Sequence, residues 1–285
     1  MQSAFILGAD SAIANSLWKA LSANGVRLVG TTRRRQRVCG NIDLFDLASD
    51  SAQSLDPKTD VGYLCAAITS MAQCEANSAG TREVNVWRLV EIAKRLHDLG
   101  MFVVFLSSSA VFDGTEAFMQ EGANPNPANE YGRQKAEAES HVLALGGTAV
   151  VRLTKVLDAG TAIVEGWRKD LLEGRVIHPF EDLVMAPVSK RFATGLLWHV
   201  GECRGDGVFH GSGEKDLSYA DFADMLAAAL GADRNLVVPV SSEEAGVKLE
   251  FRPRFSALGM GATKARLGIG TQPAEELICE ILQAA

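Results

Sequence analysis

The chain has 285 residues, of which 28 are Lys or Arg and 35 are Asp or Glu, so its formal net charge is −7. An acidic chain lacks the basic footprint of proteins that bind nucleic acid or anionic membranes, and we expect neither partner. The apolar share of 47% with 22% charged residues is typical of a globular protein and excludes a largely disordered chain. A chain of this length predicts one large domain with a modest second lobe.

The cysteine pattern and the hydropathy indicate the compartment. Five scattered cysteines contain no Cys-x-x-Cys pair, and the five histidines show no ligand-like spacing, so we expect neither a disulfide framework nor a metal site. No apolar run approaches the ~20 residues needed to cross a bilayer, and strand-like sequence begins almost at Met1, which leaves no room for a signal peptide. We therefore expect a cytoplasmic protein.

Short apolar runs recur through the first half of the chain, each with the length of a buried strand. They span residues 4–7, 26–29, 61–66, 102–106 and 149–153. Segments with the period of a helix lie between them, at residues 13–23, 83–99 and 130–145. Because apolar strands that alternate with helices form parallel sheets covered on both faces, the sequence predicts a Rossmann-type doubly wound α/β sheet.

The pattern is less regular after residue 156. Helical periodicity at residues 161–172, 190–200, 219–230 and 274–282 alternates with short strands near Val176, Val208 and Leu236. This half predicts a smaller lobe, from which some segments return to the first. The stretch from residue 112 to residue 129 is too long for an ordinary connection and is interpreted as a functional loop.

The first predicted strand runs into Gly-Ala-Asp-Ser-Ala-Ile-Ala at residues 8–14 and then into an amphipathic helix. A dinucleotide-binding turn occupies this position, where glycines let the backbone approach a pyrophosphate and the helix N-terminus supplies a positive dipole. Only one of the three glycine positions holds glycine, so a simple helix N-cap is the alternative. The candidate cofactor contacts are Gly8, Asp10, Ser11, Ala12 and Ile13.

The second strand ends at Thr32, Arg33 and Arg34, where an NAD site would place an acidic residue for the ribose 2′-hydroxyl. Arginine favours a 2′-phosphate instead, because its planar fork can hold phosphate through two hydrogen bonds, and so the cofactor predicted is NADP(H). A solvated arginine turn is the alternative. Asp43, followed by Leu44, lies where a third strand would present a carboxylate to an adenine amine, although a turn aspartate competes with this interpretation.

Tyr131 and Lys135 are four residues apart on a predicted helix and therefore share one face. Upstream, a buried strand ends in a run of three serines that includes Ser108, at the edge of the sheet where such folds bind ligands. An ammonium beside a phenol favours the phenolate, so we expect Lys135 to lower the pKa of Tyr131 from about 10 toward 7. Such a tyrosine can give a proton to a carbonyl oxygen while a nicotinamide delivers hydride. A helix-surface pair is the alternative.

These motifs resemble those of the extended short-chain dehydrogenase/reductases, most of all the dTDP-4-dehydrorhamnose reductase group. The resemblance covers nearly the whole chain. It rests on Ala-Ala-Ile-Thr at 66–69, Val-Asn-Val at 84–86, the serine segment 105–114, Asn-Glu-Tyr-Gly-Arg-Gln-Lys at 129–135, Val-Arg-Leu at 151–153, Gly-Val-Phe-His at 207–210 and Arg-Pro-Arg-Phe-Ser-Ala-Leu at 252–258.

The resemblance implies an NADP(H)-dependent reductase that acts on a keto group of a nucleotide-linked deoxysugar, in carbohydrate biosynthesis. It assigns Tyr131 as general acid and base, Lys135 also to the nicotinamide ribose, and Ser108 to the carbonyl. Further cofactor contacts would be Ala66, Ala67, Thr69 and Asn85, and further substrate contacts Ser109, Ala110, Lys155 and Arg252. An NADP-binding Rossmann domain would span residues 1–155 with returning segments at about 184–212, and a substrate-binding lobe would comprise 156–183 and 213–285.

Some positions depart from the family pattern. Ser11 and Ala14 replace glycines, Lys155 stands where these reductases usually carry tryptophan, and Gly-Met at 259–260 replaces Asp-Thr. A sugar-nucleotide dehydratase would need an Asp-Glu pair at residues 109–110, whereas a sugar-nucleotide epimerase stays open. A catalytically silent NADP-binding regulatory subunit is the alternative of another class. The resemblance also allows a homodimer through helices 83–99 and 130–145.

Overall fold

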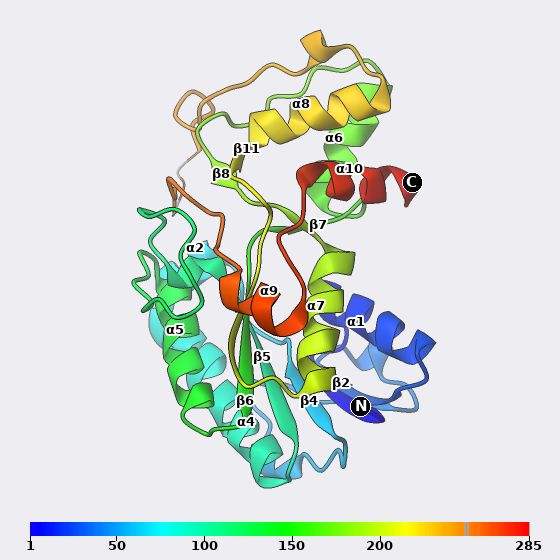
Figure 1. Ribbon diagram of the computed structural model, residues 1–285, viewed down its shortest axis with the longest axis vertical. Helices are drawn as coiled ribbons and strands as arrows, with labels where there is room; N and C mark the ends of the chain where they lie inside the picture. Colours follow the sequence, from blue (N-terminus) through cyan, green and yellow to red (C-terminus); the bar gives the residue numbers. More distant parts are fainter. Residues whose placement is uncertain (248, 250, 285) are drawn as a thin grey trace.

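A parallel sheet of seven strands forms the centre of the computed structural model, which describes residues 1–247, 249 and 251–284 (Figure 1). The spatial order is β10-β6-β5-β4-β1-β2-β3. The strands are β1 (Ser3–Leu7), β2 (Arg27–Thr32), β3 (Ile42–Leu44), β4 (Val61–Leu64), β5 (Phe102–Ser108), β6 (Thr148–Leu153) and β10 (Gly207–Gly211). All five apolar runs expected to be strands lie in this sheet, and the Rossmann-like α/β fold is confirmed.

The order of the strands determines where a ligand can bind. The chain builds β1, β2 and β3 outward in one direction and then returns to the other side of β1 with β4. Adjacent crossovers therefore leave the sheet on opposite faces, which opens a crevice at the carboxyl ends of β1 and β4. Every residue of β1 is buried, as expected of a strand covered on both faces.

Helices cover both faces of the sheet (Figure 1). On one face, α1 (Ala12–Ala23) and α7 (Lys190–Cys203) bury leucines such as Leu17 and Leu197 against the strands. On the other face, α4 (Leu89–Asp98) and α5 (Glu130–Leu143) contribute Leu96 and Val142. These apolar faces hold the sheet rigid, so that the strand ends present fixed side chains to the crevice.

The helix predicted over residues 83–99 is two elements. A π-helix, η3 (Glu83–Arg88), precedes α4, and two short helices that the sequence did not predict, α2 (Met71–Ala76) and α3 (Ser78–Arg82), come before it. A π-helical turn has a wider hydrogen-bond spacing than an α-helix and often occurs at functional sites. Here it contains Asn85, which is buried at 1% exposure.

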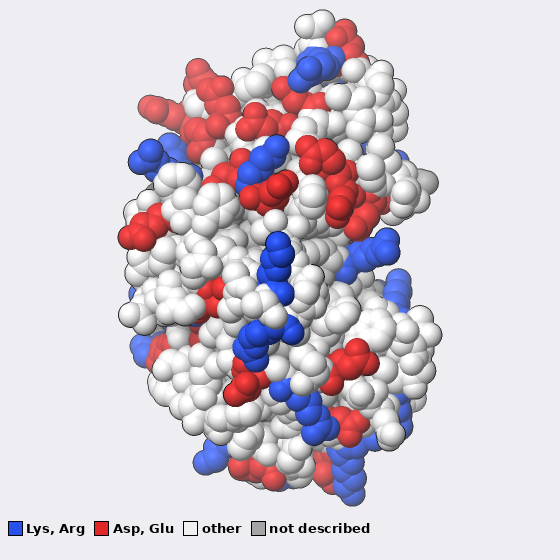
Figure 2. Space-filling view, viewed as in Figure 1, with Lys and Arg blue, Asp and Glu red and all other residues white. Residues whose placement is uncertain are grey.

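The smaller lobe is built from the second half of the chain. Helices α6 (Ala162–Leu172), α8 (Tyr219–Leu230) and α10 (Ala274–Gln283) enclose an apolar cluster around Phe222, beside the paired strands β8 (Val184–Met185) and β11 (Leu217–Ser218) (Figure 1). The strands expected near Val176 and Leu236 are replaced by isolated bridges, from Ile177 to Val237 and from Phe180 to Val240. Strand β7 (Val156–Leu157) pairs with β9 (Val188–Ser189) where the chain passes between the lobes. Acidic side chains gather over this lobe in the view of Figure 2.

The chain crosses between the two lobes more than once. Helix α9 (Gly261–Leu267) lies in the C-terminal part of the sequence but packs on β10, and the backbone N–H of His210 donates to Thr263 Oγ1 at 2.9 Å. In the other direction, β8 lies within the segment 184–212 but pairs with β11 of the smaller lobe. The division at residues 155, 183 and 212 therefore stays a prediction.

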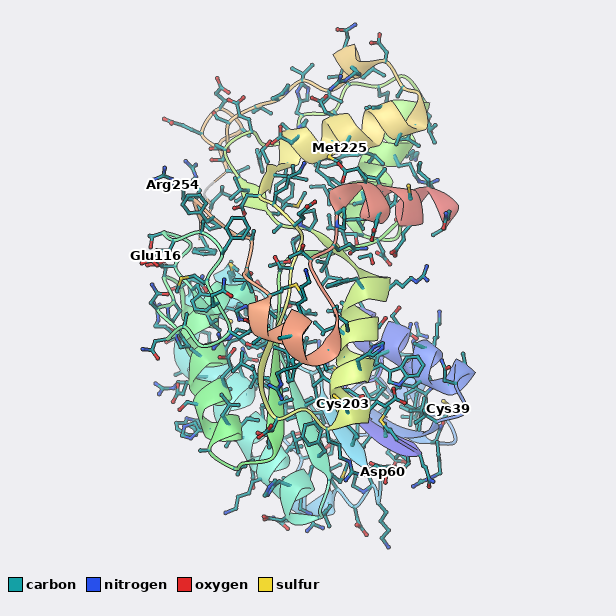
Figure 3. The ribbon with its side chains drawn as sticks, in the orientation of Figure 1. Cys39, Asp60, Glu116, Cys203, Met225 and Arg254 are labelled. Atoms are coloured by element: carbon teal, nitrogen blue, oxygen red, sulfur yellow. The ribbon has the colours of Figure 1, made fainter. Side chains whose placement is uncertain are left out.

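Short 3-10 helices complete the chain: η1 (Arg35–Arg37), η2 (Ala52–Ser54), η4 (Ser109–Val111) and η5 (Arg234–Leu236). The five cysteines are free thiols, and Cys39 and Cys203 are exposed on the larger lobe (Figure 3). Within the described ranges, no helix is both long enough and apolar enough to cross a bilayer.

Candidate active site

Two adjacent pockets lie at the carboxyl ends of the central strands. The larger has a volume of about 610 Å³ and the smaller about 260 Å³. The loop after β4 separates them, because Cys65, Ala67 and Thr69 line both. The two pockets are thus neighbouring halves of one site, divided by residues 65–69.

The turn after β1 forms one wall of the smaller pocket. Gly8 has φ +76°, and a Cβ at this position would lie 2.9 Å from the Cβ of Ala66, so only glycine fits the turn without strain. Its N–H donates to Thr31 Oγ1 at 3.2 Å, which fixes the turn on β2. Ser11 is the N-cap of α1, but its side chain makes no capping hydrogen bond in the described structure. The first amides of α1, including that of Ala12, are therefore free to bind an anion.

The two arginines after β2 have different environments. Arg34 lies 3.2 Å from Asp10, its Nε facing the carboxylate, so its charge is compensated locally. Arg33 lines the smaller pocket and has no ion pair within the part of the chain that the structure describes. Thr32 is buried, and its Oγ1 accepts a hydrogen bond from the N–H of Arg34 at 3.1 Å, so it shapes the turn. An uncompensated guanidinium in this pocket fits a phosphate-bearing ligand.

The third strand does not place its residues where the sequence suggested. Asp43 pairs with Thr31 in the sheet and, like Leu44, is exposed outside the lining of the smaller pocket. The strand ends a residue later, and Asp46, Leu47 and Ala48 line the pocket instead. The sequence offered one signal for these residues, namely a second aspartate three positions after Asp43 at the end of the same apolar run.

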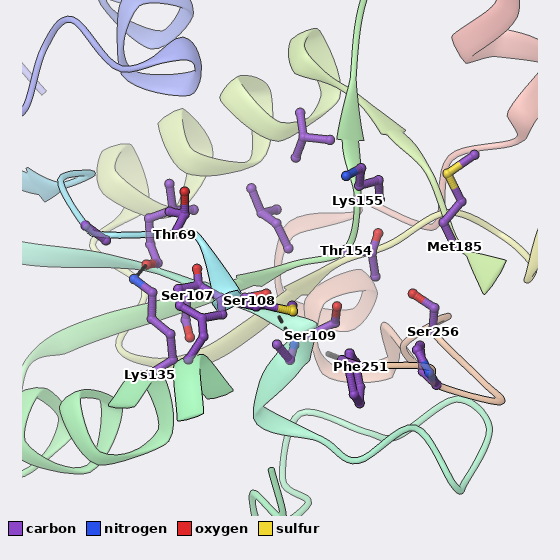
Figure 4. Close-up of a pocket in the computed structure, with 18 of the residues that line it drawn as sticks. Thr69, Ser107, Ser108, Ser109, Lys135, Thr154, Lys155, Met185, Phe251 and Ser256 are labelled. Atoms are coloured by element: carbon purple, nitrogen blue, oxygen red, sulfur yellow. Dashed lines mark hydrogen bonds between the residues drawn. The ribbon is translucent and has the colours of Figure 1, made fainter. Parts of the chain in front are cut away.

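Ser108, Tyr131 and Lys135 all line the larger pocket. Figure 4 shows Ser108 and Lys135 there. Ser108 ends β5, and its Oγ accepts a hydrogen bond from the N–H of Ala110 at 3.2 Å, which starts η4. Helix α5 approaches η4 so closely that a Cβ on Gly132 would lie 2.0 Å from the carbonyl oxygen of Ala110. The glycine thus permits the contact that places Tyr131 beside Ser108.

Burial dominates the electrostatics of this trio. Desolvation raises the pKa of Tyr131 well above its ordinary value, and a hydrogen bond with Ser108 only partly opposes it. Desolvation lowers the pKa of Lys135 to about 8. Its Nζ donates to the carbonyl oxygen of Leu106 at 2.9 Å and lies 4.5 Å from the ring centre of Phe105.

The expected lowering of the Tyr131 pKa by Lys135 is therefore wrong for this structure. The ammonium is held by Leu106 and lies 6.0 Å from the centre of the Tyr131 ring. Because burial penalises the phenolate, Tyr131 keeps its proton at neutral pH. The residue is therefore in the form that a proton donor requires.

One polar atom of the larger pocket lacks a partner. The Oγ of Ser107 is buried without a hydrogen bond among the described residues, although Ser107 lines the pocket. Buried hydroxyls are nearly always satisfied, so an orphaned one beside a cavity fits a ligand with a polar group. Together with the free helix terminus and Arg33, it makes the two pockets fit a phosphorylated dinucleotide.

Most of the remaining predicted residues line one of the two pockets, and two of them lie outside both. Ile13, Ala67, Thr69, Ser109, Ala110 and Lys155 line the larger pocket, whereas Ala66 lines the smaller one. Asn85 lies in neither lining but holds the loop between the pockets, with its Oδ1 accepting from the N–H of Ile68 at 2.8 Å. Arg252 is also outside, because its guanidinium lies 3.0 Å from Asp182 on the smaller lobe.

The smaller lobe supplies a wall that the sequence did not reveal. Its pocket-lining residues are apolar or neutral: Leu183, Val184, Met185, Tyr219, Leu249, Phe251, Pro253 and Ser256. They come from a two-residue strand, a helix start and an irregular segment, and only Pro253 and Ser256 belong to a motif that the sequence offered, at residues 252–258. In Figure 4, Lys155 and Met185 lie across the pocket from Lys135. Among the described residues, no group of three or more His, Cys, Asp or Glu side chains could hold a metal ion.

The fold and the site together define a Rossmann-like α/β protein with a serine, a tyrosine and a lysine at the ligand-binding edge of its sheet. The chain belongs to the RmlD substrate binding domain family, whose model matches residues 2–285.

Proteins of two kinds are similar to this chain in sequence. A dTDP-4-keto-6-deoxy-D-glucose reductase of Streptomyces niveus is 30% identical over 219 residues, which cover 70% of each chain. The methionine adenosyltransferase 2 subunit beta of Bos taurus is 27% identical and covers 93% of this chain and 82% of its own. A dTDP-4-dehydrorhamnose reductase structure from Bacillus anthracis, in complex with NADP, has the same fold at a TM-score of 0.88, with 21% identity and coverage of 100% and 99%.

Proposed function

We propose that the protein is an NADP(H)-dependent reductase of a keto group on a nucleotide-linked deoxysugar. The observation that carries the proposal is the convergence of Ser108, Tyr131 and Lys135 in a pocket that adjoins the one containing Gly8 and Arg33. The family supports the same class of reaction, as does the reductase from Streptomyces niveus, which is 30% identical to this chain.

Each side chain has a role that follows from its surroundings. A bound nicotinamide would supply the hydride to the carbonyl carbon. Tyr131, protonated because it is buried, gives its proton to the carbonyl oxygen, while the Ser108 hydroxyl orients that oxygen. The phenolate left behind needs a nearby positive charge, and Lys135, on the next turn of α5, supplies it once substrate is bound and its ammonium leaves the carbonyl oxygen of Leu106. The apolar wall from the smaller lobe excludes water.

Arg33 is proposed to select the phosphorylated form of the dinucleotide. It is exposed in the smaller pocket and has no ion pair with any residue that the structure describes, whereas Arg34 is paired with Asp10. We expect Arg33→Ala to weaken NADPH binding by about 10- to 100-fold, the range for a lost charged hydrogen bond, and NADH binding far less. Arg34→Ala is the matched control. Calorimetric titration with both dinucleotides measures the difference, and an equal loss for both would assign Arg33 to the solvated surface.

A catalytically silent regulatory subunit is the second candidate. The likeness to a methionine adenosyltransferase subunit and the replacement of glycines by Ser11 and Ala14 favour it. Against it, a subunit that only binds nucleotide has no need for a protonated tyrosine beside a serine and a buried lysine. In either case, the homodimer through η3, α4 and α5 stays a prediction.

Turnover of a panel of nucleotide-linked 4-keto sugars, followed by the loss of NADPH absorbance, tests the proposal. We expect reduction of at least one sugar, and a fall in kcat of about 10²- to 10⁴-fold in Tyr131→Phe, the usual contribution of a positioned proton donor. The variant should still bind NADPH. Tight NADPH binding with no turnover that depends on Tyr131 would instead establish the regulatory subunit.

A further inference from the structure

Gln134 lies between Tyr131 and Lys135 on α5 but does not face either pocket. Its side chain is completely buried, and its amide makes hydrogen bonds through both of its polar atoms. Nε2 donates to Thr81 Oγ1 at 2.8 Å and to Glu130 Oε1 at 3.1 Å. Oε1 accepts from Asn85 Nδ2 at 2.8 Å. A buried amide that is satisfied on both sides has one fixed orientation.

Asn85 extends this contact to the loop between the pockets. Its Nδ2 also donates to the carbonyl oxygen of Ile68 at 2.9 Å, and its Oδ1 accepts from the N–H of Ile68 at 2.8 Å. The side chain therefore holds both backbone groups of one residue. The neighbours of Ile68, Ala67 and Thr69, line both pockets.

The acceptor on Gln134 and the two backbone groups of Ile68 together set which way the Asn85 amide points. With Nδ2 directed at Gln134, Oδ1 is left facing the N–H of Ile68. A flipped Asn85 would set its oxygen against that of Gln134 and its NH₂ against the N–H of Ile68, so two acceptors and two donors would meet. The orientation of Asn85 and the position of the loop thus both depend on α5.

We propose that Gln134 is a positioning residue, which through Asn85 fixes the loop 66–69 relative to Tyr131 and Lys135. The proposal rests on the reductase function proposed above. Because that loop separates the two pockets, its distance from α5 sets where a ligand in the smaller pocket ends relative to the proton donor. Gln134 touches neither ligand and acts only through Asn85.

Two variants separate positioning from packing. Gln134→Met keeps the volume of the side chain and removes the acceptor for Asn85. Thr81→Val is the matched control, because it removes one of the hydrogen bonds on the other side of the same amide and leaves the link to Asn85 intact. Gln134→Glu, which keeps an oxygen facing Asn85 and can donate to Thr81 when protonated, is the conservative variant for rescue at low pH.

The first measurement is hydrogen exchange at the amide of Ile68 in the protein without ligands. We expect Gln134→Met to speed this exchange by about tenfold, as for one lost hydrogen bond, and Thr81→Val to leave it unchanged. Equal effects of the two variants, or no effect of Gln134→Met, would assign Gln134 to packing alone. If Gln134→Met does not fold, the same comparison is made with Gln134→Ala, which also lacks the acceptor for Asn85.

The second measurement compares NADPH affinity, kcat and the KM for the keto sugar in the variant and the wild type. Gln134→Met should weaken NADPH binding and lower kcat, each by about tenfold, with little change in KM for the keto sugar. A rise in the sugar KM alone would overturn the proposal. If the wild-type chain binds NADPH but reduces no sugar, the proposed function fails, while the exchange at Ile68 still decides whether Gln134 positions the loop.

Discussion

The two walls of the larger pocket are built differently. Ser108 and Tyr131 come from the sheet and from a helix packed on it, and a backbone contact at Gly132 fixes their separation. The opposite wall comes from a two-residue strand that includes Met185 and from the irregular segment around Phe251. The difference separates the chemistry, which needs fixed distances, from substrate choice, which can change with the loops of the smaller lobe.

The wall from the smaller lobe is nevertheless attached to the sheet. The loop 112–129 follows η4, and the carbonyl oxygen of Gly114 accepts hydrogen bonds from the N–H groups of Arg254 and Phe255 at 3.0 and 2.9 Å. Figure 3 shows Glu116 and Arg254 at this junction. Further along, Glu121 accepts from the N–H of Thr263 at 2.7 Å. The attachment thus combines these polar contacts with the apolar packing of Leu258 against Val111 and Phe112.

Acid should destabilise the protein through His210, which lies in β10 of the sheet and contacts the C-terminal segment at Gly259. Burial lowers the pKa of His210 to about 4 from an ordinary 6.5, and its Nδ1 lies 2.8 Å from the carbonyl oxygen of Gly259. The unfolded chain takes up the proton first, so the free energy of unfolding falls as pH drops from 6.5 to about 4, by about 3 kcal/mol in total from this group.

Urea unfolding across this pH range measures the effect. His210→Gln should lose most of the pH dependence between these two values, while the wild type keeps it. If the free energy of unfolding of His210→Gln depends on pH as steeply as that of the wild type, other groups cause the acid sensitivity.

The fixed wall is tested at Gly132. A methyl group there meets the carbonyl oxygen of Ala110 at 2.0 Å, so we expect Gly132→Ala to destabilise the protein by about 1–3 kcal/mol and to lower kcat by moving Tyr131. Gly166→Ala in α6 is the control, because a Cβ there meets nothing within 4 Å, and it should stabilise by about 0.5–1 kcal/mol. Thermal unfolding with kinetics distinguishes the two, and similar effects at both glycines would contradict the close approach.

The variable wall is tested at Lys155, which lines the pocket across from Lys135. If it binds an anionic part of the substrate, Lys155→Met should raise KM for the keto sugar by about tenfold, the scale of one charged hydrogen bond, with NADPH affinity unchanged. Steady-state kinetics measures the KM for the keto sugar, and a binding titration measures the NADPH affinity. A loss of NADPH affinity instead would place Lys155 in the cofactor site and would contradict the separation of the two walls.

The sequence predicted the strands and the serine, tyrosine and lysine because their signals are local. Apolar runs mark buried strands, and the four-residue spacing of Tyr131 and Lys135 places both on one helix face. Other features depend on partners far along the chain. Arg252 turns away because Asp182 lies beside it, and Asp46 replaces Asp43 in the pocket lining because β3 ends after three residues. The π-helix around Asn85 likewise could not be predicted, because its apolar pattern over six residues does not differ from that of the α-helix that follows it.

The contact between Gly114 and the segment after Pro253 limits how new specificities can be constructed. A Cβ at Gly114 would lie 2.3 Å from the Cβ of Pro253, so the two segments match each other in shape. A C-terminal segment transplanted from a relative would meet a loop 112–129 shaped for another partner. Exchange of substrate preference between members of this family therefore requires both segments to be transferred together, although they lie far apart in the gene.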